Sequence, residues 1–292
     1  MSRKFTSEDF DYDPYLKKLF ESLEDEECRV NASHNEKHKK APKFNSKDPE
    51  VKCMYDYIPK NLLPDIHNPH EEVHGLKLPM RAVIVSPSGG GKTNLLFHLI
   101  SLFSGPPQGT FYQINVITRN KDEPLYKYLE KVSDGKVVVT EGLHTTPRLD
   151  SYNKHLNSLL VFDDLVLEKN LEKVCEFYIR ARKLGVSVIF ISQSYFMIPK
   201  VIRTNCTYMF VLKLGGSSRE VNMILSELAL SVSKEELIKL YKRCTSKKFS
   251  FMLIDFESDE TKRFRCGYKD VIDITVKDGG PTEKQELVED SN

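Results

Sequence analysis

Between about residues 76 and 277, short apolar runs alternate with longer stretches in which apolar residues recur every three or four positions. The apolar runs are rich in β-branched residues and predict strands, whereas the periodic stretches predict amphipathic helices. Strands with hydrophobic residues at nearly every position are covered on both faces, so this alternation predicts an α/β domain with a mainly parallel sheet flanked by helices. The predicted strands are RAVIVS, FYQINVIT, KVVVT, SLLVFDD, GVSVIFIS and CTYMFVLKL.

The helical segments follow the same order. Helices are predicted in NLLFHLISLF, EPLYKYLEKV, EKNLEKVCEFYIRARK, SREVNMILSELAL and SKEELIKLYKRC. Two late runs, KKFSFMLIDF and KRFRCGYKDV, alternate apolar and polar residues more regularly and predict an antiparallel edge hairpin near the C-terminus.

The two ends of the chain have a different composition. Residues 1–75 are rich in charged and turn-forming residues, which predicts a charged, partly disordered N-terminal extension before a domain at 76–277. A disordered tail is expected at 278–292. No cysteine accompanies the histidines of the extension at the spacing of a familiar zinc motif, so solvated loop residues are expected at His34, His38, His67, His70 and His74.

Composition narrows the function only slightly. The 43 basic and 42 acidic residues give a net charge of +1, so any surface that binds nucleic acid must be local. The six cysteines lie far apart, which favours free thiols in a reducing compartment. The charged N-terminus and the absence of a long apolar run favour a soluble, intracellular protein that does not enter a membrane.

The segment SPSGGGKTN has the pattern of a phosphate-binding loop between a strand and a helix. Glycines allow the backbone N–H groups to approach phosphate oxygens, Lys92 can reach the β- and γ-phosphates, and Thr93 can bind Mg²⁺. Ser86 replaces the usual first glycine and is tolerated if its φ stays negative. A chance GGGKT in a loop is the alternative. The expected nucleotide-binding residues are Ser86, Pro87, Ser88, Gly89, Gly90, Gly91, Lys92, Thr93 and Asn94.

Polar residues also follow two other predicted strands. In LLVFDDL, Asp163 is expected to bind Mg²⁺ and Asp164 to orient or deprotonate the attacking water, the alternative being a helix cap or turn. Gln193 ends VSVIFISQ, and its amide could contact both the γ-phosphate and that water, although a glutamine after a strand is often a plain loop residue. Because parallel strands end at one edge of a sheet, Lys92, both acids and Gln193 are expected to lie together.

Read together, these segments resemble the genome-packaging ATPases of large DNA viruses, the poxvirus-type, virophage and Polinton proteins of the FtsK and HerA superfamily. The resemblance covers about residues 81 to 227. It implies a RecA-like core that binds ATP and Mg²⁺. The matching segments are VIVSPSGGGKTNLL, INVITRNKDEPLYKYL, LLVFDDL and FYIRARKLGVSVIFISQSYFMIPKVIRTNCTYMFVLK.

The resemblance also implies partners. The expected assembly is a homo-oligomeric ring, hexamer or pentamer, which translocates double-stranded DNA into a capsid and contacts a capsid or portal protein. Such a protein acts in the host cytoplasm or a viral factory and can be associated with the virion. An arginine that reaches a neighbour's γ-phosphate is implied; Arg203 is favoured, and Arg180 and Arg182 are alternatives.

Two departures from the superfamily concern the site. Ser86 replaces a glycine, and the acidic pair is Asp-Asp where many cellular relatives have Asp-Glu, so Asp164 must position the attacking water with a shorter side chain. Basic residues that could contact DNA phosphates, or simply form solvated surfaces, are Arg119, Lys121, Lys127, Lys242, Arg243, Lys247 and Lys248.

Three other functions are compatible with a phosphate-binding loop. A cellular-type DNA pump or helicase of the same superfamily would be favoured by membrane spans or a winged-helix module, neither of which is seen. A small-molecule kinase usually carries an arginine-rich lid, and the long segment around Gln193 argues against it. A non-catalytic nucleotide-binding scaffold does not need the lysine, threonine and paired acids that this chain retains.

Overall fold

In the computed structural model, the described residues are Cys53, Tyr55, 58–106, 108–215, 218–228 and 233–272. The chain divides into two compact units, Met1–Pro59 and Lys60–Asn292. All helices and strands discussed below belong to the second unit. The predicted extension before residue 53 and the predicted tail at 278–292 lie outside the described residues, as do Cys28, His34 and His38.

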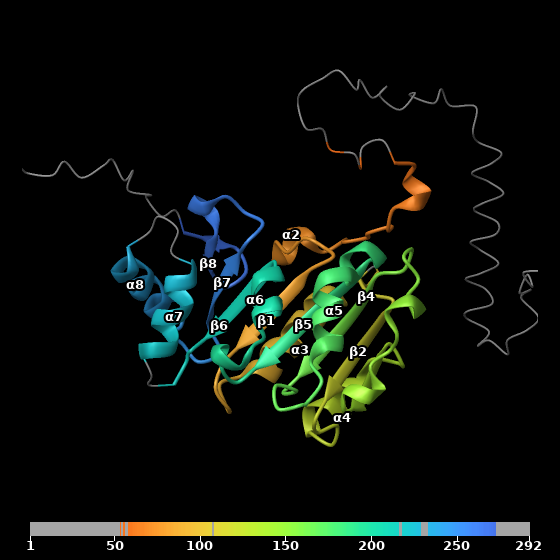
Figure 1. Ribbon diagram of the computed structural model, residues 1–292, viewed down its shortest axis with the longest axis horizontal. Helices are drawn as coiled ribbons and strands as arrows, with labels where there is room; N and C mark the ends of the chain where they lie inside the picture. The colour runs from red at the N-terminus through yellow and green to blue at the C-terminus, as the bar shows by residue number, and fades with distance from the viewer. Residues whose placement is uncertain are drawn as a thin grey trace, which may run out of the picture. The chain divides into compact units, whose positions relative to one another are not determined.

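The described residues form one mixed sheet in the order β3-β2-β4-β5-β1-β6-β7-β8-β9 (Figure 1). The six strands from β3 to β6 in this order pair in parallel, and β7, β8 and β9 pair antiparallel at one edge. Both the parallel sheet and the late hairpin are therefore confirmed. The strands are β1 Arg81–Val85, β2 Gln113–Thr118, β3 Val137–Glu141, β4 Ser158–Asp163, β5 Val186–Ser192, β6 Tyr208–Leu212, β7 Phe251–Asp255, β8 Phe264–Cys266 and β9 Asp270–Val271.

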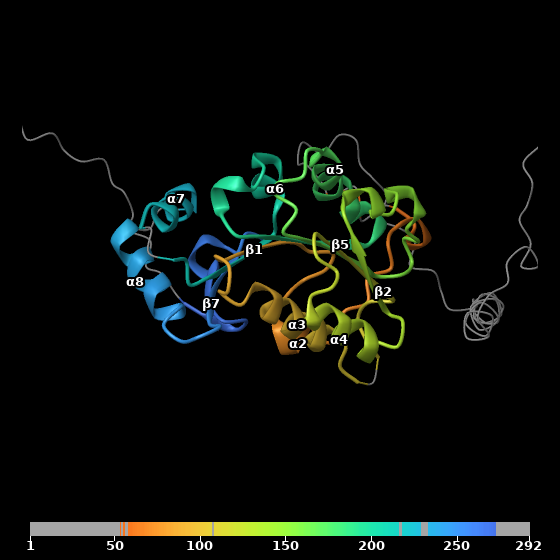
Figure 2. The same cartoon turned by 90° about the horizontal axis from the view of Figure 1, so that it is seen from below.

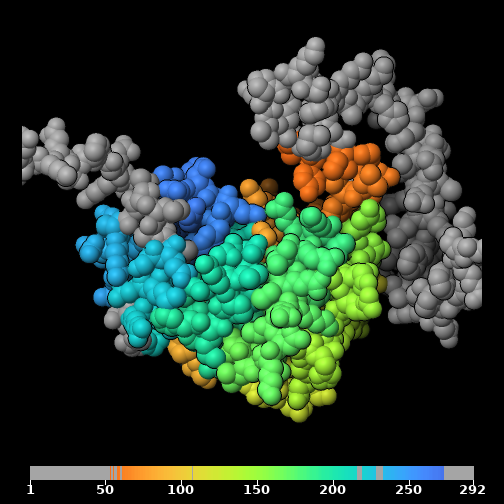
Figure 3. All heavy atoms as spheres, viewed as in Figure 1, coloured from red at the N-terminus to blue at the C-terminus, as the bar shows by residue number. Residues whose placement is uncertain are grey.

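Helices cover both faces of the sheet, as the continuous hydrophobicity of its strands requires (Figure 2). One face carries α2 Glu71–His74, α3 Lys92–Phe103 and α4 Pro124–Val132. The other carries α5 Glu172–Arg180, α6 Lys200–Asn205 and α7 Ser218–Leu228, and is the face turned toward the viewer in Figure 3. Helix α8 Lys234–Cys244 lies beside the antiparallel edge. Short 3-10 helices are η3 Lys60–Leu62, η4 Leu143–Thr145, η5 Leu149–Ser151, η6 Ala181–Leu184, η7 Tyr195–Met197 and η8 Glu260–Lys262.

The core consists of two hydrophobic clusters, one on each side of the sheet. Side chains alternate along β1, so Ala82 and Ile84 pack with α3 and α4 while Val83 and Val85 pack with α5 to α8. All four are fully buried. The strand that precedes the phosphate loop is therefore fixed from both sides.

The prediction of solvated histidines is wrong for His70 and His74. His70 Nε2 lies 2.9 Å from the carbonyl oxygen of Gly105, so it donates a hydrogen bond there. His74 is fully buried, its Nδ1 accepts from the Leu76 N–H at 3.0 Å, and its ring packs edge-on against Phe103. Burial lowers the pKa of His74 to about 4. These contacts attach residues 70–76 to the end of α3, so this part of the predicted extension packs with the sheet domain.

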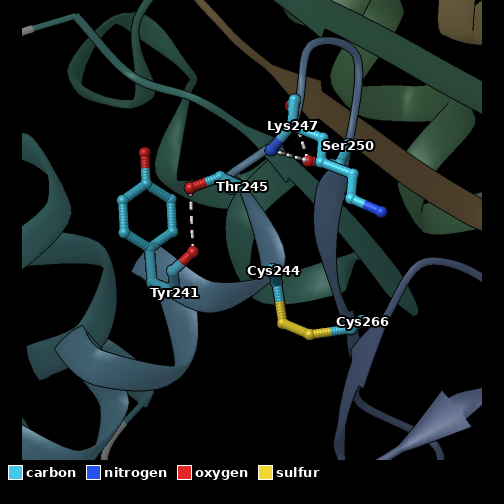
Figure 4. Close-up of a disulfide and its surroundings, with 6 residues drawn as sticks. All are labelled: Tyr241, Cys244, Thr245, Lys247, Ser250 and Cys266. Carbon is cyan, nitrogen blue, oxygen red and sulfur yellow. Dashed lines mark hydrogen bonds between the residues drawn. A yellow bond between two sulfur atoms is a disulfide. The ribbon is translucent and has the colours of Figure 1, made fainter.

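The prediction that all cysteines are free is also wrong. Cys244, the last residue of α8, and Cys266, the last residue of β8, form a disulfide across a sequence separation of 22 residues (Figure 4). The packing of α8 against the edge hairpin brings them together, which no local spacing could reveal. Among the described cysteines, Cys53, Cys175 and Cys206 are free.

Candidate functional site

The segment between β1 and α3 folds as an anion-binding turn. Gly89 and Gly91 adopt left-handed conformations, with φ of 72° and 98°, which side chains with a Cβ rarely adopt. The Gly90 N–H donates to Pro87 O at 3.0 Å and closes the turn. At the start of α3, Gly91 provides no side-chain cap, and the first turn has no acidic residue. The backbone N–H groups there are thus available to phosphate oxygens.

Ser86 forms the inner wall of this turn. It is fully buried, and its N–H donates to Ser192 O at 3.2 Å. Its φ is not positive, so a serine fits this backbone conformation. A Cβ on Gly90 would lie 1.9 Å from Ser86 Oγ. The serine is therefore accommodated because residue 90 is glycine, and its side chain occupies space inside the turn.

Lys92 points back over the loop that precedes it. Its Nζ donates a hydrogen bond to Pro87 O at 3.0 Å. Burial lowers the pKa of Lys92, and the negative charges of Asp163 and Asp164 oppose this effect. The lysine thus lies within electrostatic reach of both acids.

Asp163 ends β4 in a buried position. Its side chain is only 6% exposed, and the Tyr126 hydroxyl donates to its Oδ2 at 2.6 Å. Burial raises the pKa of Tyr126 and the nearby Thr93 hydroxyl opposes this rise, so the tyrosine lies close to both predicted Mg²⁺ ligands. Sequence reasoning missed Tyr126, since an apolar-periodic position of a helix reads as a core residue.

Burial raises the pKa of Asp163 to about 6, and the hydrogen bond from Tyr126 opposes this rise. The ionised carboxylate is therefore poorly stabilised by the protein groups around it. Thr93 and Asp163 offer oxygen donors only, the type that Mg²⁺ prefers, and a cation beside Asp163 would relieve its buried charge. The residues present fit Mg²⁺.

Asp164 and Gln193 are in direct contact. Gln193 Nε2 donates to Asp164 Oδ1 at 3.0 Å, and Asp164 adopts a positive φ of 54°. The strands β4 and β5 are neighbours, and Asp163 is in register with Ile191, two residues before Gln193. The structure therefore brings Lys92, both acids and Gln193 to one edge of the sheet. Their roles in hydrolysis stay predictions.

A family model described as Poxvirus A32 protein matches residues 71–266. The chain belongs to this family. The predicted resemblance to poxvirus-type proteins is thereby confirmed, and the match includes the whole of the site described above.

Among curated proteins, the chain is 27% identical over 161 residues to the DNA packaging protein OPG160 of Monkeypox virus, covering 52% of this chain and 53% of that protein. The same identity relates it to DNA packaging protein OPG160 of Vaccinia virus strain Copenhagen, covering 59% of that protein. The chain thus spans between half and three fifths of the length of the curated relatives that it matches.

Solved structures show a weaker similarity. The genome packaging NTPase B204 from Sulfolobus turreted icosahedral virus 2 in complex with sulfate gives a TM-score of 0.47 at 15% identity, covering 63% of this chain and 94% of B204. Its complex with ATP-γ-S gives 0.44 at 16% identity, covering 62% and 94%. These values are too low to support a conclusion about function.

The three candidate arginines of this A32-family chain differ in their surroundings. Arg203 Nη1 lies 2.6 Å from Glu227 Oε1, its guanidinium stacks over the Tyr195 ring, and its side chain is 15% exposed. Arg180 pairs with Glu176 on the surface of α5, and Arg182 is exposed. A role for Arg203 in a neighbouring site requires its pair with Glu227 to open.

The candidate DNA-contacting residues fall into three groups. Arg119 and Lys121 line an open cavity of about 770 Å³, and Glu141, His144 and Glu168 line it as well. Lys127 pairs with Asp122 at 2.8 Å. The exposed residues of the third group lie at the end of α8 and in the following turn: Lys242, Arg243, Lys247 and Lys248. Arg119 and Lys121 follow β2 and Lys127 lies on α4, whereas the third group lies at the end of α8 and after it.

A search of the described residues for membrane spans found no helix with the length and apolar character needed to cross a bilayer.

Proposed function

We propose that this chain is an ATP-driven translocase that packages double-stranded DNA into a viral capsid. The observation that carries the proposal is the meeting of four elements at one sheet edge. These are the phosphate loop with the free N–H groups at the start of α3, Lys92, the buried Asp163 with its Tyr126 hydrogen bond, and the hydrogen-bonded pair of Asp164 and Gln193. An anion site alone binds phosphate, whereas the adjoining acids and amide provide groups for hydrolysis.

The residues divide the work of hydrolysis between them. The loop N–H groups hold the phosphates, and Lys92 exchanges its bond to Pro87 O for the β- and γ-phosphate oxygens. Mg²⁺, held by Thr93 and Asp163, neutralises charge on the triphosphate when bound. Asp164 orients the attacking water and accepts its proton. Gln193, whose amide donates a hydrogen bond to Asp164, changes its contacts when the γ-phosphate leaves.

Three observations support DNA as the load. The family is that of the poxvirus A32 protein, the curated relatives are named DNA packaging proteins, and the exposed basic residues Lys242 and Arg243 lie in the last turn of α8. The assembly proposed with this function is a hexameric or pentameric ring that contacts a capsid or portal protein in the host cytoplasm or viral factory. Arg203 is the proposed arginine supplied to a neighbouring site, after its release from Glu227.

Variants of the sheet-edge residues test the proposal. ATP hydrolysis is measured for the wild type, Lys92→Ala and Asp163→Ala, with Lys131→Ala as a control for loss of an exposed lysine on α4. The expected result is a loss of at least about 100-fold for the two site variants and wild-type rates for the control. Wild-type rates in both site variants would show that hydrolysis does not use this edge.

A further inference from the structure

A second cavity adjoins the phosphate loop on the side away from the acids. It has a volume of about 400 Å³ and lies between three segments that are distant in sequence. These are the loop residues Pro87, Gly89 and Gly90, the stretch Lys213–Gly215 after β6, and the turn Ser246–Ser250 between α8 and β7. The nucleotide-binding residues predicted from the sequence include only the first of them.

The strand order determines which part of a nucleotide reaches this cavity. Strand β1 has β5 on one side and β6 on the other. Asp163, Asp164 and Gln193 all lie on the β5 side, so the γ-phosphate must face that side to be hydrolysed. The α-phosphate, ribose and base then leave the loop on the opposite side, where β6 ends and the cavity opens.

Phe249 provides a flat apolar surface at this place. Its side chain is 44% exposed, although it lies against the phosphate loop: a Cβ on Gly91 would be 2.5 Å from Phe249 Cδ1. Its φ is 66°, a region that residues other than glycine, asparagine and aspartate rarely adopt. Lys248 Nζ lies 4.9 Å from the ring centroid. An exposed aromatic ring in an unfavourable backbone conformation beside a ligand site is typical of a binding residue.

Several bonds hold the turn in position (Figure 4). Ser250 Oγ donates to Lys247 O at 2.7 Å and accepts from the Lys247 N–H at 3.1 Å. The disulfide of Cys244 and Cys266 fixes the last residue of α8, two residues before the turn, to the last residue of β8. These contacts hold the backbone on both sides of Phe249.

The opposite wall is attached to the same helix. Tyr241 Oη, on α8, accepts a hydrogen bond from the Leu214 N–H at 2.7 Å and donates to Leu212 O at 3.3 Å. Both walls of the cavity are therefore fixed to α8, and the protein's own contacts set the shape of the cavity.

We propose that this cavity is the base and ribose subsite of the nucleotide, with Phe249 as the ring on which the base stacks. The proposal rests on the proposed function, since it assumes that a nucleoside triphosphate occupies the phosphate loop. Lys213, Lys247 and Lys248 place positive charge around the same cavity, next to the path of the α-phosphate. The Ser246–Ser250 turn thus contributes the part of the affinity that depends on the base.

The test compares a ligand that has a base with one that lacks it. Dissociation constants for Mg·ATP and for Mg·tripolyphosphate are measured by calorimetry on the wild type, Phe249→Leu and Phe249→Tyr. Leucine fills the space above Gly91 without an aromatic face, whereas tyrosine keeps the ring. Because base stacking is lost, Phe249→Leu is expected to bind ATP about 5- to 150-fold more weakly than the wild type. Phe249→Tyr should bind ATP with nearly the wild-type affinity. All three proteins should bind tripolyphosphate with the same affinity.

The other outcomes separate this inference from the proposed function. A wild type that binds neither ligand would refute nucleotide binding itself. Wild-type ATP affinity in Phe249→Leu would overturn the base subsite and leave the proposed function intact. Equal weakening of ATP and tripolyphosphate would also overturn it, because the ring would then act on the shape of the phosphate loop.

Discussion

Replacing the buried Asp163 by asparagine should stabilise the protein in the absence of Mg²⁺ and nucleotide, and should prevent ATP hydrolysis. The aspartate has a pKa of about 6 in the folded chain against an ordinary value of 3.8, mainly because burial disfavours its charged form. This rise corresponds to about 3 kcal/mol of unfavourable free energy for the ionised carboxyl in the folded state. Asparagine has nearly the same shape, carries no charge, and its carbonyl oxygen can still accept the Tyr126 hydrogen bond.

The sign of the effect sets a pH window. Below pH 3.8 the carboxyl is protonated in the folded and unfolded chains, so aspartate and asparagine should be equivalent. Between pH 3.8 and about 6 the unfolded chain ionises this carboxyl while the folded chain keeps its proton, so the wild type loses stability as the pH rises, and the loss is complete above about pH 6. The advantage of Asp163→Asn should therefore be small near pH 3.5 and reach about 3 kcal/mol at pH 8.

The assay is urea unfolding without Mg²⁺ or nucleotide at several pH values. Asp134→Asn is the matched control, since Asp134 is exposed and asparagine tolerates its positive φ of 50°. It should change the free energy of unfolding by less than about 0.5 kcal/mol. With Mg·ATP added, the wild type should gain stability and Asp163→Asn should not. Equal stability of Asp163→Asn and the wild type at pH 8 would refute the argument from burial.

Four further predictions concern single contacts. Tyr126→Phe removes the hydrogen bond to Asp163, so it should raise the Mg²⁺ concentration needed for half-maximal ATP hydrolysis about tenfold. The circular dichroism spectrum should not change. An unchanged Mg²⁺ requirement would contradict this prediction. Reduction of the Cys244–Cys266 disulfide, or its replacement by two serines, should lower the free energy of unfolding by about 3 kcal/mol in urea titrations. Gly90→Ala should abolish ATP binding because its Cβ meets Ser86 Oγ, and adding Ser86→Gly should restore part of it; equal binding by both variants would argue against this clash. Mixing Arg203→Ala with Lys92→Ala subunits should recover ATP hydrolysis if Arg203 acts between chains, whereas no recovery despite proven co-assembly would exclude that role.

Much of the fold followed from hydrophobic patterning. The runs before Ser86 and Asp163 are each hydrophobic at four successive positions, which is typical of a strand covered on both faces, and both form parallel strands. Once the sheet is parallel, its carboxyl ends share one edge, so the contact between Asp164 and Gln193 follows from strand order. This is why distant segments of the site could be assembled from the sequence.

The missed features depend on tertiary contacts that no local pattern records. Tyr126 lies at an apolar-periodic position of α4, and only the approach of β4 gives its hydroxyl a partner. Cys244 and Cys266 meet because α8 packs beside the edge hairpin. His74 follows a charged stretch, yet a single helical turn buries it against Phe103. Each of these residues reads as ordinary core or loop until its neighbours are placed.

The most direct test of the central claim is ATP hydrolysis by the purified wild-type protein with and without double-stranded DNA, with Lys92→Ala measured in parallel. The proposed motor predicts hydrolysis that double-stranded DNA accelerates, an acceleration that weakens as salt rises, and no activity above background in Lys92→Ala. A wild type that hydrolyses no ATP under either condition, or at the same rate with and without DNA, would contradict it.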